Sequence, residues 1–366
     1  MDMKKLLFVI DDLGSGGAQR QLINLSLIMI RKGYDISFLI YHPEYFWLPI
    51  LDKHEIVVQT VLNKNKILRF FKMRALIRKG QYDSVISYLQ TPNLISELAT
   101  FPKKSWTLVV SERSSNPKIS KSLALRSIRL LHSRADYVVA NSHSNLNLVI
   151  PVKTWLRRAD YSVIYNLIDT DYWYPKANFK FRSGDVLKLV VCASHQKLKN
   201  ASGLLRALDL MPLEYKRRIK IDWYGGFRNE NFFKETEDLM KSLELQEIVT
   251  FYGEERDILG KYQDADAVGL FSYYEGMPNV ICEAMSCGKP VVVSEVSDLP
   301  DIISDGQNGF LCDPHSTESI KLALMKLLDS SIELLCKMGE LNRDLALELF
   351  EQEKIANQYI ELLENE

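Results

Sequence analysis

FSYYEGMPNVICEAMSCGKP, residues 271–290, is the stretch of sequence that decides the fold. Its pattern predicts an apolar strand at 268–271, an amphipathic helix at 279–287 and a second apolar strand at 290–293. A helix that joins two buried strands is the repeating element of parallel sheets covered by helices on both faces. The stretch therefore predicts an α/β fold.

The loop and first helical turn of this stretch have the features of an anion site. We expect Asn279 to be the N-cap of the helix and Gly288 to end it. Unpaired N–H groups at a helix start, aided by the helix dipole, suit a diphosphate. The segment that would supply them consists of Gly276, Met277, Pro278, Asn279 and Val280.

Two carboxylates flank this segment. Glu275 follows the strand and Glu283 lies within the helix, so both are placed to accept hydrogen bonds from sugar hydroxyls on either side of a diphosphate. Isolated glutamates are more usually solvated, and surface charge is the alternative interpretation.

The same alternation of short apolar strands and helix-length segments extends through both halves of the chain. In the first half we expect strands near 5–10, 35–40, 84–88, 107–110, 136–140 and 162–165, and helices near 17–32, 64–79, 92–100 and 121–133. In the second half we expect strands near 187–191, 220–224, 248–251, 268–271 and 290–293, and helices near 200–209, 231–243, 279–287 and 317–328.

Length and a break in the pattern predict two domains. A chain of 366 residues exceeds the size that one core usually serves, about 250–300 residues. The segment 171–185 contains Pro175 and shows no clear period, which is typical of a linker. We therefore expect an N-terminal domain at 1–170 and a C-terminal domain at 186–348.

Composition indicates an ordinary globular protein. The chain is 46% apolar and 25% charged with a net charge of -1, which excludes wholesale disorder, collagen-like repeats and disulfide scaffolds. The five cysteines form no C-x-x-C pair and sit in apolar surroundings of the sequence. This favours reduced thiols in a cytoplasm and argues against structural zinc. The apolar run at 6–10 is too short for a signal peptide, and no apolar stretch approaches the about 18 residues of a membrane span.

The near-zero net charge conceals an asymmetry. Residues 1–170 contain 24 Lys and Arg against 13 Asp and Glu, a net charge of +11, which leaves -12 for residues 171–366. The helix expected at 64–79 has basic residues around one apolar stripe, which consists of Ile67, Phe70, Phe71, Met73 and Ile77. An ordinary packed helix with a solvated basic face is the alternative interpretation. Such a patch attracts anionic lipid, phosphate or nucleic acid, although no nucleic-acid motif accompanies it. We expect peripheral contact with an anionic membrane and no nucleic-acid partner.

A glycine-rich loop follows the first strand. Gly14, Gly16 and Gly17 let backbone approach a ligand beside a helix N-terminus. The dinucleotide pattern G-x-G-x-x-G would need glycine where Gln19 stands, and no P-loop lysine follows, so nicotinamide and ATP sites are weak interpretations. A plain strand-to-helix turn remains the alternative.

Taken together, these motifs resemble a known family. Glu275 and Glu283 form an E-x(7)-E pair, and the surrounding sequence resembles the retaining glycosyltransferases of family four, whose fold is GT-B. The resemblance covers nearly the whole chain. Its further motifs are Gly16-Gly17-Ala18, Asn141-Ser142, Asn166 to Asp171, Lys199-Asn200, Gly253, Asp264-Ala265-Asp266 and Gly306 to Pro314.

The resemblance implies an architecture. Two Rossmann-like domains are expected to enclose an interdomain cleft, with the nucleotide on the C-terminal domain and the acceptor on the basic N-terminal domain, where Gly16 and Gly17 belong to the acceptor-side loop. The final helix, within 349–366, is expected to pack back on the first domain.

The resemblance also assigns roles in the donor site. Glu283 matches the glutamate that binds the nucleotide ribose, Glu275 matches the one that faces the donor sugar, and Lys199 matches the lysine that binds the phosphates. Gly253 belongs to the same donor site. We expect the Lys199 ammonium to stabilise charge on the departing nucleotide.

One position departs from the family pattern. The family's partner arginine, five residues before the lysine, falls on Ser194 here. Lys197, the ring of His195 or backbone amides remain as sources of the missing charge.

A second loop points to the acceptor. The segment Ser111-Glu112-Arg113 with Pro117 resembles the branch of the family that adds N-acetylhexosamine or related sugars to lipid-linked acceptors. Arg113 is expected to bind an acceptor diphosphate or the donor phosphates through its planar fork. A surface ion pair of Arg113 with Glu112 or a neighbouring residue is the alternative.

No metal or cofactor is expected. Two D-x-D matches, at 169–171 and 264–266, would suit a metal-dependent glycosyltransferase of the other common fold, but the GT-B resemblance accounts for both positions. The six histidines show no metal-ligand spacing.

These inferences predict a retaining glycosyltransferase. It would move an N-acetylhexosamine or hexose from a nucleotide sugar, expected to be UDP-linked, to a hydroxyl of a glycan or lipid-linked glycan in bacterial-type surface polysaccharide or glycoprotein assembly. A two-lobed sugar-binding module without turnover is one alternative. A nucleotide-sugar hydrolase or epimerase on a similar scaffold is the other.

Overall fold

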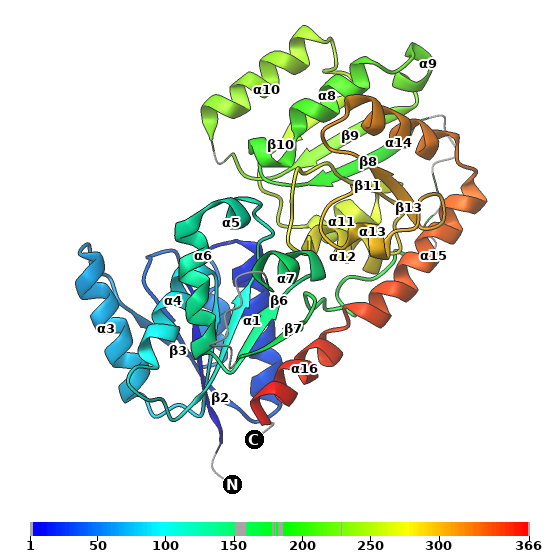
Figure 1. Ribbon diagram of the computed structural model, residues 1–366. Coiled ribbons are helices and arrows are strands. Elements are labelled where there is room, and N and C mark those ends of the chain that lie inside the picture. The colour runs from blue at the N-terminus through cyan, green and yellow to red at the C-terminus, as the bar shows by residue number, and fades with distance from the viewer. Residues whose placement is uncertain are drawn as a thin grey trace. The chain divides into compact units, whose positions relative to one another are not determined.

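The chain divides into two compact units, each built on its own sheet (Figure 1). The computed structural model describes residues 3–150, 159–177, 179, 181, 186–227 and 229–364. Unit 1 consists of Met1–Leu167 and Gln352–Glu366, and unit 2 is Ile168–Glu351. The predicted linker at 171–185 thus begins inside unit 2.

Unit 1 has a seven-stranded parallel sheet in the order β3-β2-β1-β4-β5-β6-β7. Its strands are β1 (Lys5–Val9), β2 (Asp35–Ile40), β3 (Val57–Thr60), β4 (Ser84–Tyr88), β5 (Thr107–Glu112), β6 (Tyr137–Ala140) and β7 (Asp160–Val163). Its helices are α1 (Gly17–Arg31), α2 (Leu48–Lys53), α3 (Lys66–Lys79), α4 (Gln90–Ala99), α5 (Lys118–Lys121), α6 (Leu123–Arg129), the 3-10 helix η1 (Leu130–Arg134), α7 (His143–Val149) and α16 (Gln352–Glu364).

Both faces of this sheet are buried, as the continuous apolar run of β1 requires. Leu6 and Phe8 pack with residues of α1 and α16 on one face. Leu7 and Val9, one position out of phase, pack with residues of α3 and α4 on the other. This alternation confirms the doubly covered parallel sheet that the sequence predicts.

Unit 2 has a six-stranded parallel sheet in the order β10-β9-β8-β11-β12-β13. Its strands are β8 (Leu187–Cys192), β9 (Ile219–Tyr224), β10 (Val249–Tyr252), β11 (Ala267–Leu270), β12 (Val291–Ser294) and β13 (Gly309–Cys312). Its helices are the 3-10 helix η3 (Lys197–Lys199), α8 (Ala201–Asp209), α9 (Leu213–Lys216), α10 (Glu230–Ser242), α11 (Ile258–Gln263), α12 (Asn279–Ser286), α13 (Leu299–Ile302), α14 (Thr317–Asp329) and α15 (Ile332–Leu349). The α/β fold with two Rossmann-like domains is therefore confirmed.

Several predicted elements need correction. The helix expected at 121–133 is interrupted, because α6 ends at Arg129 and the tighter turn of η1 continues the chain. The strands β3 and β13 were not predicted. The 18-residue helix α15 was not predicted either, because its buried face includes Gly339 and Asn342, which break the apolar period.

Helix α15 lies against α12 through a glycine contact. A Cβ on Gly339 would lie 2.2 Å from the carbonyl oxygen of Gly288, the residue that ends α12 in the left-handed conformation with φ of +66°. Asn342 Nδ2 donates to the carbonyls of Lys289 and Asn308 at 2.8 and 2.7 Å. Arg343 Nη1 donates to the carbonyls of Thr170, Trp173 and Ser286. The carboxyl end of α12 is therefore fixed by α15.

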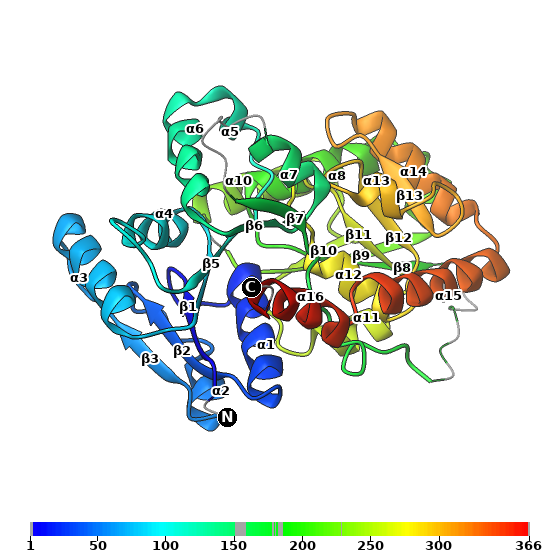
Figure 2. The same cartoon turned by 60° about the horizontal axis from the view of Figure 1, so that its bottom comes forward.

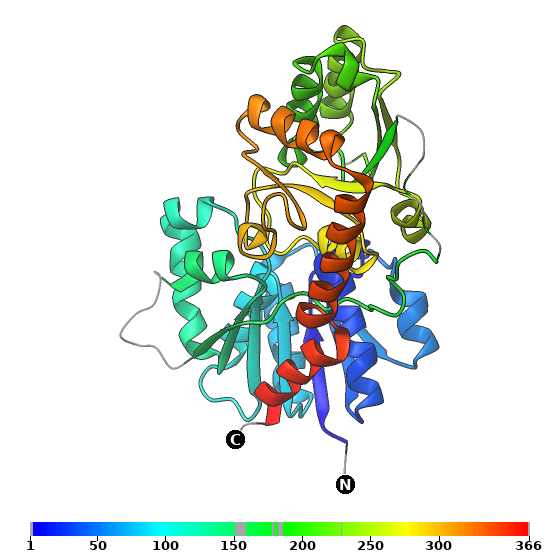
Figure 3. The ribbon, with the colours of Figure 1, turned by 90° about the vertical axis from the view of Figure 1, so that its right-hand side faces the viewer.

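The last helix completes the core of unit 1. A short turn joins α15 to α16 (Figure 3), and α16 lies beside α1 (Figure 2). Ile355, Tyr359 and Leu363 are buried in the same core as Leu6 and Phe8.

A buried ion network fixes the carboxyl end of β5. His132 Nδ1 lies 2.5 Å from Glu97 Oε1, and His132 Nε2 lies 3.2 Å from Glu112 Oε1. Arg129 Nη2 donates to Glu112 Oε2 at 2.8 Å. Both ring nitrogens face carboxylates, so the ring is held as a doubly protonated imidazolium. Although burial favours the neutral ring, the charge of Glu97 and the hydrogen bond to Glu112 raise the pKa of His132 to about 9.

We predict that replacing Gly339 by Ala destabilises unit 2. Overpacking against Gly288 costs about 1–3 kcal/mol, which offsets the gain of about 1 kcal/mol in helix propensity. The melting temperature of Gly339→Ala should therefore fall, while Glu340→Ala, the exposed neighbour on the same helix, should stay near wild type. An unchanged or higher melting temperature for Gly339→Ala would contradict the close contact.

We also predict a pH dependence for unit 1. Because the pKa of His132 is raised to about 9 in the folded protein, its stabilisation is complete below the unfolded pKa of about 6.5 and is lost as the pH rises through 9. Between pH 6 and pH 10 the loss is roughly 2–3 kcal/mol of unfolding free energy relative to His132→Gln. Urea unfolding at each pH measures this loss of unfolding free energy. Amide hydrogen exchange in β5 reports on unit 1 specifically. Parallel pH profiles for the two proteins would refute the assignment.

Candidate functional site

The winding of the unit 2 sheet reverses between β8 and β11, which are neighbours in the sheet. Loops that follow two such strands leave in opposite directions and open a crevice at the carboxyl edge, where doubly wound sheets bind ligands. The loop after β8 carries Ser194, Lys197 and Lys199, and the loop after β11 carries Glu275 to Pro278. The topology thus brings the predicted donor-site residues to one place.

An ion pair joins the two loops. Lys199 Nζ donates to Glu275 Oε1 at 2.6 Å, with the side chains 21% and 13% exposed. The backbone supports the pair, since Tyr273 N donates to the carbonyl of Leu198 at 3.0 Å. Partial burial weakens solvent screening, so the ammonium and the carboxylate act on any ligand in this crevice.

Asn200, which has a left-handed backbone conformation, fixes the position of Lys199. Asn200 has φ of +61° and caps α8, with its side chain accepting from Gly203 N and donating to the carbonyl of Pro314. The left-handed conformation ends η3 and starts α8 within one residue. Lys199 therefore projects from a short, fixed turn.

The loop before α12 differs from the prediction at one residue. The N-cap is Pro278, not Asn279, which is the first residue of the helix. Met277 is buried and anchors the loop, while Gly276 and Val280 are half-buried. The first turn of α12 still faces the carboxyl edge of the sheet, because the helix follows β11 directly.

Glu283 lies on the second turn of α12 and is 2% exposed. Its burial contradicts the alternative of a solvated surface charge. The negative charge is also felt locally, since burial first and the carboxylate of Glu283 second raise the pKa of Cys287 to about 12. That thiol stays protonated and is no nucleophile.

The position of the missing arginine is occupied by small and neutral groups. Ser194 Oγ accepts a hydrogen bond from Gln196 Nε2 at 3.0 Å. The His195 ring is 2% exposed and stacks on Phe227 at 4.6 Å between centroids, with Nε2 3.0 Å from the carbonyl of Tyr252. Burial lowers the pKa of His195, so this ring supplies no charge at neutral pH. Lys197 is exposed.

Two glycines that the sequence interpretation passed over shape the neighbouring edge. A Cβ on Gly225 would lie 2.1 Å from the carbonyl oxygen of Ala193, so only glycine permits β9 to approach the loop after β8. Gly225 N donates to the carbonyl of Gly253 at 3.1 Å, which places this predicted donor-site glycine beside the same loop. The Gly225-Gly226 pair directly after a strand was the available signal.

Unit 1 carries the other candidate residues. Its winding reverses between β1 and β4, and the loop after β1 holds Gly16, the N-cap of α1, and the exposed Gly17. Asp12 Oδ1 accepts from Gly14 N and from Gln19 Nε2, both at 2.8 Å. Gln19, which breaks the dinucleotide pattern, therefore closes the loop on itself.

Arg113 follows β5 and is held by two partners. Nη2 donates to Asn166 Oδ1 at 2.5 Å, and the guanidinium lies 4.6 Å above the ring of Tyr88. Glu112 is committed to Arg129 and His132, so the predicted alternative of a surface ion pair between Arg113 and Glu112 is wrong.

Three buried polar atoms of this segment lack hydrogen-bond partners within the described part of the chain. They are Ser111 Oγ, Arg113 Nη1 and Ser115 Oγ. Buried polar groups are normally paired, so such atoms beside a charged side chain indicate a ligand. The Tyr88 hydroxyl, next to the Arg113 guanidinium, donates to the hydroxyl of Tyr359 on α16. No sequence pattern predicts this contact, because 271 residues separate the two tyrosines.

The two D-x-D sequences have structural partners. Asp169 Oδ1 accepts from the backbone N–H groups of Asp171 and Tyr172, which closes a turn. Asp264 pairs with Lys176 at 2.5 Å, and Asp266 Oδ2 accepts from Lys188 N at 2.8 Å. No group of three or more His, Cys, Asp or Glu suited to a metal occurs among the residues that the structure describes.

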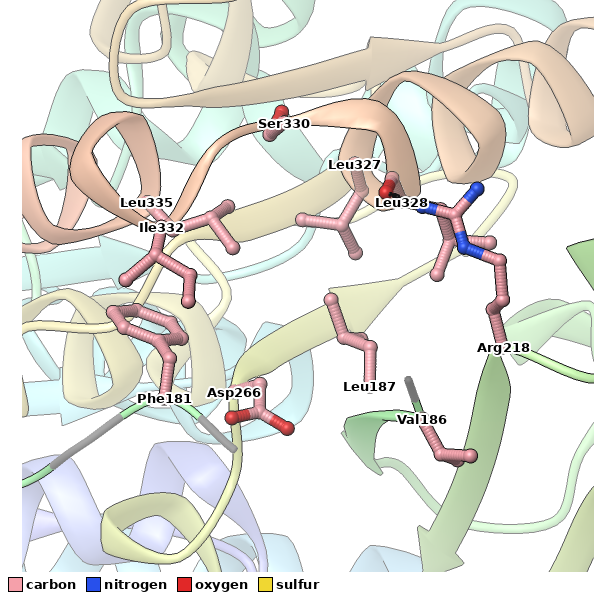
Figure 4. A pocket seen from close by; sticks show the side chains of 10 residues that line it. All are labelled: Phe181, Val186, Leu187, Arg218, Asp266, Leu327, Leu328, Ser330, Ile332 and Leu335. Atoms are coloured by element: carbon pink, nitrogen blue, oxygen red, sulfur yellow. Dashed lines mark hydrogen bonds between the residues drawn. The ribbon is translucent and has the colours of Figure 1, made fainter. Parts of the chain in front are cut away.

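A pocket of unit 2 lies away from Lys199 and Glu275. Leu187, Asp266 and Leu335 are among the side chains that line it (Figure 4). Leu187 begins β8 and Asp266 precedes β11, so the pocket is at the amino edge of the sheet, opposite to Lys199 and Glu275. Its polar groups serve the fold, as the Asp266 bond to Lys188 N shows.

None of the five cysteines, all of which lie within the described ranges, forms a disulfide. Four of the five are buried and Cys336 is exposed, so the expectation of apolar surroundings is wrong for that residue. Within the described ranges, no helix combines the length and apolar character needed to cross a membrane.

Comparison with known proteins identifies the chain's relatives. The family described as Glycosyltransferase Family 4 matches residues 15–172, and the family described as Glycosyl transferases group 1 matches residues 176–344. Together these matches cover most of both units.

Individual relatives agree with these families. The chain is 27% identical over 241 residues to the N-acetyl-alpha-D-glucosaminyl L-malate synthase of Bacillus anthracis, a match that covers 63% of the chain and 60% of that protein. It is 26% identical to the N-acetylgalactosamine-N,N'-diacetylbacillosaminyl-diphospho-undecaprenol 4-alpha-N-acetylgalactosaminyltransferase of Campylobacter jejuni, over 89% of the chain and 91% of that protein.

A solved structure shows the same fold. Anabaena HepE, in complex with UDP and glucose, superposes with a TM-score of 0.84 at 21% identity, over 98% of this chain and 99% of that one. The fold is therefore GT-B, and with both halves matched by their families, the chain belongs to the family four, group 1 glycosyltransferases.

Proposed function

We propose that the protein transfers a sugar, an N-acetylhexosamine or a hexose, from a UDP-sugar to a hydroxyl of a lipid-linked glycan with retention of the anomeric configuration. The observation that carries the proposal is the Lys199–Glu275 ion pair at the reversal point of the unit 2 sheet. The pair joins the cation that we expect to bind the phosphates and the carboxylate that we expect to bind the sugar. UDP and glucose in HepE, and the undecaprenol-linked acceptor named for the Campylobacter jejuni relative, support the donor and acceptor classes.

In the proposed reaction the bond between the anomeric carbon and the UDP β-phosphate oxygen breaks. A bond to the acceptor oxygen forms on the same face of the sugar, and the acceptor proton leaves with UDP. Lys199 and the first turn of α12 stabilise the charge that grows on the diphosphate. Glu275 accepts hydrogen bonds from the sugar and stabilises positive charge at its ring, and Glu283 binds the ribose in ground and transition states alike.

Lys199 must change partner when the donor binds. In the structure its ammonium is paired with Glu275, and the diphosphate of a donor competes for the same cation. The released Glu275 carboxylate then has acceptor positions for sugar hydroxyls. The pair thus keeps both groups charged and oriented until the donor replaces it.

The proposed acceptor site lies in unit 1. Arg113, with its unpartnered Nη1, and the hydroxyls of Ser111 and Ser115 offer donors for an acceptor diphosphate. The loop with Gly16 and Gly17 lies at the same carboxyl edge of the sheet, two strands away. The cleft between the domains remains a prediction. The proposal includes a cytoplasmic location on the inner membrane face, surface-glycan or glycoprotein assembly, and no nucleic-acid partner.

Incubation of the enzyme with UDP-sugars and a polyprenyl diphosphate-linked glycan tests the proposal. A new glycoside with the donor's anomeric configuration is expected. Free sugar or an isomerised donor from UDP-sugar alone would instead indicate a hydrolase or epimerase, and donor binding without any product would indicate a sugar-binding module.

We predict separable effects for the two glutamates. Glu283→Ala should weaken UDP binding, because the ribose contact exists in every bound state, whereas Glu275→Ala should mainly lower kcat. Lys199→Ala should lower kcat by about 10²–10³-fold, the effect of removing one charge-stabilising donor. Calorimetric UDP titration and initial rates measure these effects, with the exposed Lys241→Ala as a control. Near-normal turnover of Lys199→Ala would transfer the phosphate role to Lys197 or Arg113.

We predict that transfer needs no divalent metal. The leaving diphosphate is stabilised by Lys199 and backbone amides, so activity should survive EDTA. Initial rates with and without chelator decide this. Loss of activity in EDTA and recovery with manganese would revive a role for the D-x-D carboxylates.

A further inference from the structure

Helix α3 is apolar on two opposite sides. Met73 and Ile77 are buried in unit 1, as expected for a helix that covers a sheet. Ile67, Leu68 and Phe71, which lie on the other side at helical spacing, are 68%, 52% and 58% exposed. We call these three residues the outer face of α3. The sequence interpretation placed Ile67 and Phe71 in the same stripe as Met73, and the structure shows that this is wrong.

The outer face has no cover within the described part of the chain, and it lies at a margin of unit 1. Figure 2 shows α3 at the outer side of this unit, beyond β3. Large apolar side chains that gather on an exposed helix, rather than occurring singly, mark an interaction surface. The nature of the surrounding charges identifies the partner.

Exposed cations surround the outer face. Lys64, Lys66 and Lys72 are exposed, and no ion pair involves them within the described ranges. Residues 56–82 contain no acidic residue. The three apolar side chains of the outer face therefore lie on a segment whose exposed lysines have no acidic neighbour in the sequence.

The arginines of α3 serve unit 1 instead. Arg74 Nη2 and Arg78 Nη1 donate to the carbonyl of Phe101, and the guanidinium of Arg69 lies 4.5 Å above the ring of Tyr41. Arg78 also donates to the carbonyl of Ala99, at the end of α4. This division separates structural arginines from lysines that are free to meet a partner.

We propose that the outer face of α3 inserts into the headgroup region of an anionic lipid bilayer while Lys64, Lys66 and Lys72 bind lipid phosphates around it. Lysines are depleted from the centres of protein interfaces but are favoured beside apolar residues at membranes, where the long stem stays in the apolar layer and the ammonium reaches the headgroups. This inference deepens the proposed function, because it brings the enzyme to the surface that holds a lipid-linked acceptor.

Insertion differs from simple electrostatic adsorption in what it requires. Adsorption depends on the lysines alone and disappears at high salt. Insertion depends on the lysines and on the three apolar residues of the outer face. Burial of these apolar side chains adds to the attraction of the lysines for anionic lipid and moves Phe71 out of water. The two modes are therefore separable by variants and by a probe at residue 71.

A fluorescent probe tests insertion directly. In a Cys336→Ser background, which leaves only buried native thiols, Phe71→Cys is labelled with an environment-sensitive dye. Leu213→Cys in the same background is the control, since Leu213 is 62% exposed on α9 of unit 2. Vesicles with about one third anionic lipid should shift the emission at residue 71 to shorter wavelength and leave residue 213 unchanged. No shift at 71, or an equal shift at 213, would overturn the proposal.

Vesicle co-sedimentation separates the contribution of the apolar residues of the outer face from that of the lysines. Replacing Ile67, Leu68 and Phe71 by Ser should weaken binding to anionic vesicles by about tenfold or more, and replacing Lys64, Lys66 and Lys72 by Gln should do the same. Leu213→Ser is the matched control and should bind like wild type. Loss with the Gln variants alone would mean electrostatic adsorption without insertion, which contradicts the proposal.

The outcome is independent of the catalytic proposal. All replaced side chains are exposed, so folding is checked by unchanged melting temperatures, and UDP binding to unit 2 should be unaffected. Transfer to a water-soluble acceptor analogue should stay at the wild-type rate in both α3 variants, while transfer to acceptor in vesicles should fall. Absence of transfer with every acceptor, together with intact insertion, would reject the proposed function and leave the membrane surface standing.

Discussion

The structure depends on one topological constraint, the reversal of winding in each parallel sheet. All strands of a parallel sheet end at one edge, and only at a reversal do two adjacent loops diverge and leave a crevice. In unit 2 this happens between β8 and β11, and the chain places Lys199 on one loop and Glu275 on the other. In unit 1 it happens between β1 and β4, beside the glycine loop and one strand from Arg113. Lys199 and Glu275 are 76 residues apart in the sequence. They meet because the reversal places their two strands side by side in the sheet.

Much of the fold could be predicted from local patterns, and so could the strand ends that carry the candidate residues of unit 2. The strand and helix periods predicted both sheets because parallel strands are continuous apolar runs, and Gly288 was recognisable as a helix end because it needs a positive φ. The tertiary contacts that hold these strands and helices in place could not be predicted from local patterns. The fit of Gly339 against Gly288 and the network of Glu97, His132 and Glu112 join segments that no short spacing relates. Tertiary contacts of this kind also decide that His195 is a buried neutral ring and that Arg113 is free of Glu112.

The two units support their loops in different ways. In unit 2 hydrogen bonds from Asn342 and Arg343 of α15 to backbone carbonyls hold the far end of α12, the helix that follows the loop with Glu275. In unit 1 charged groups hold the end of β5, and the segment just beyond it retains unpaired polar atoms. A buried ion network beside unsatisfied groups is the pattern of a preformed binding surface, because the supporting charged groups are fixed before a ligand arrives.

The path of the chain has a consequence for its synthesis. Unit 2 is inserted in unit 1, since Gln352–Glu366 completes a core that begins with β1. On the ribosome the strands of unit 1 emerge first, but Ile355 and Tyr359 are not yet made, so the face of α1 that they cover stays open. At about 5–20 residues per second, synthesis of the inserted unit takes roughly 10–40 s. Unit 2 is thus complete before α16 can cover the core of unit 1, and the nascent unit 1 must remain soluble with an uncovered apolar face until α16 leaves the ribosome.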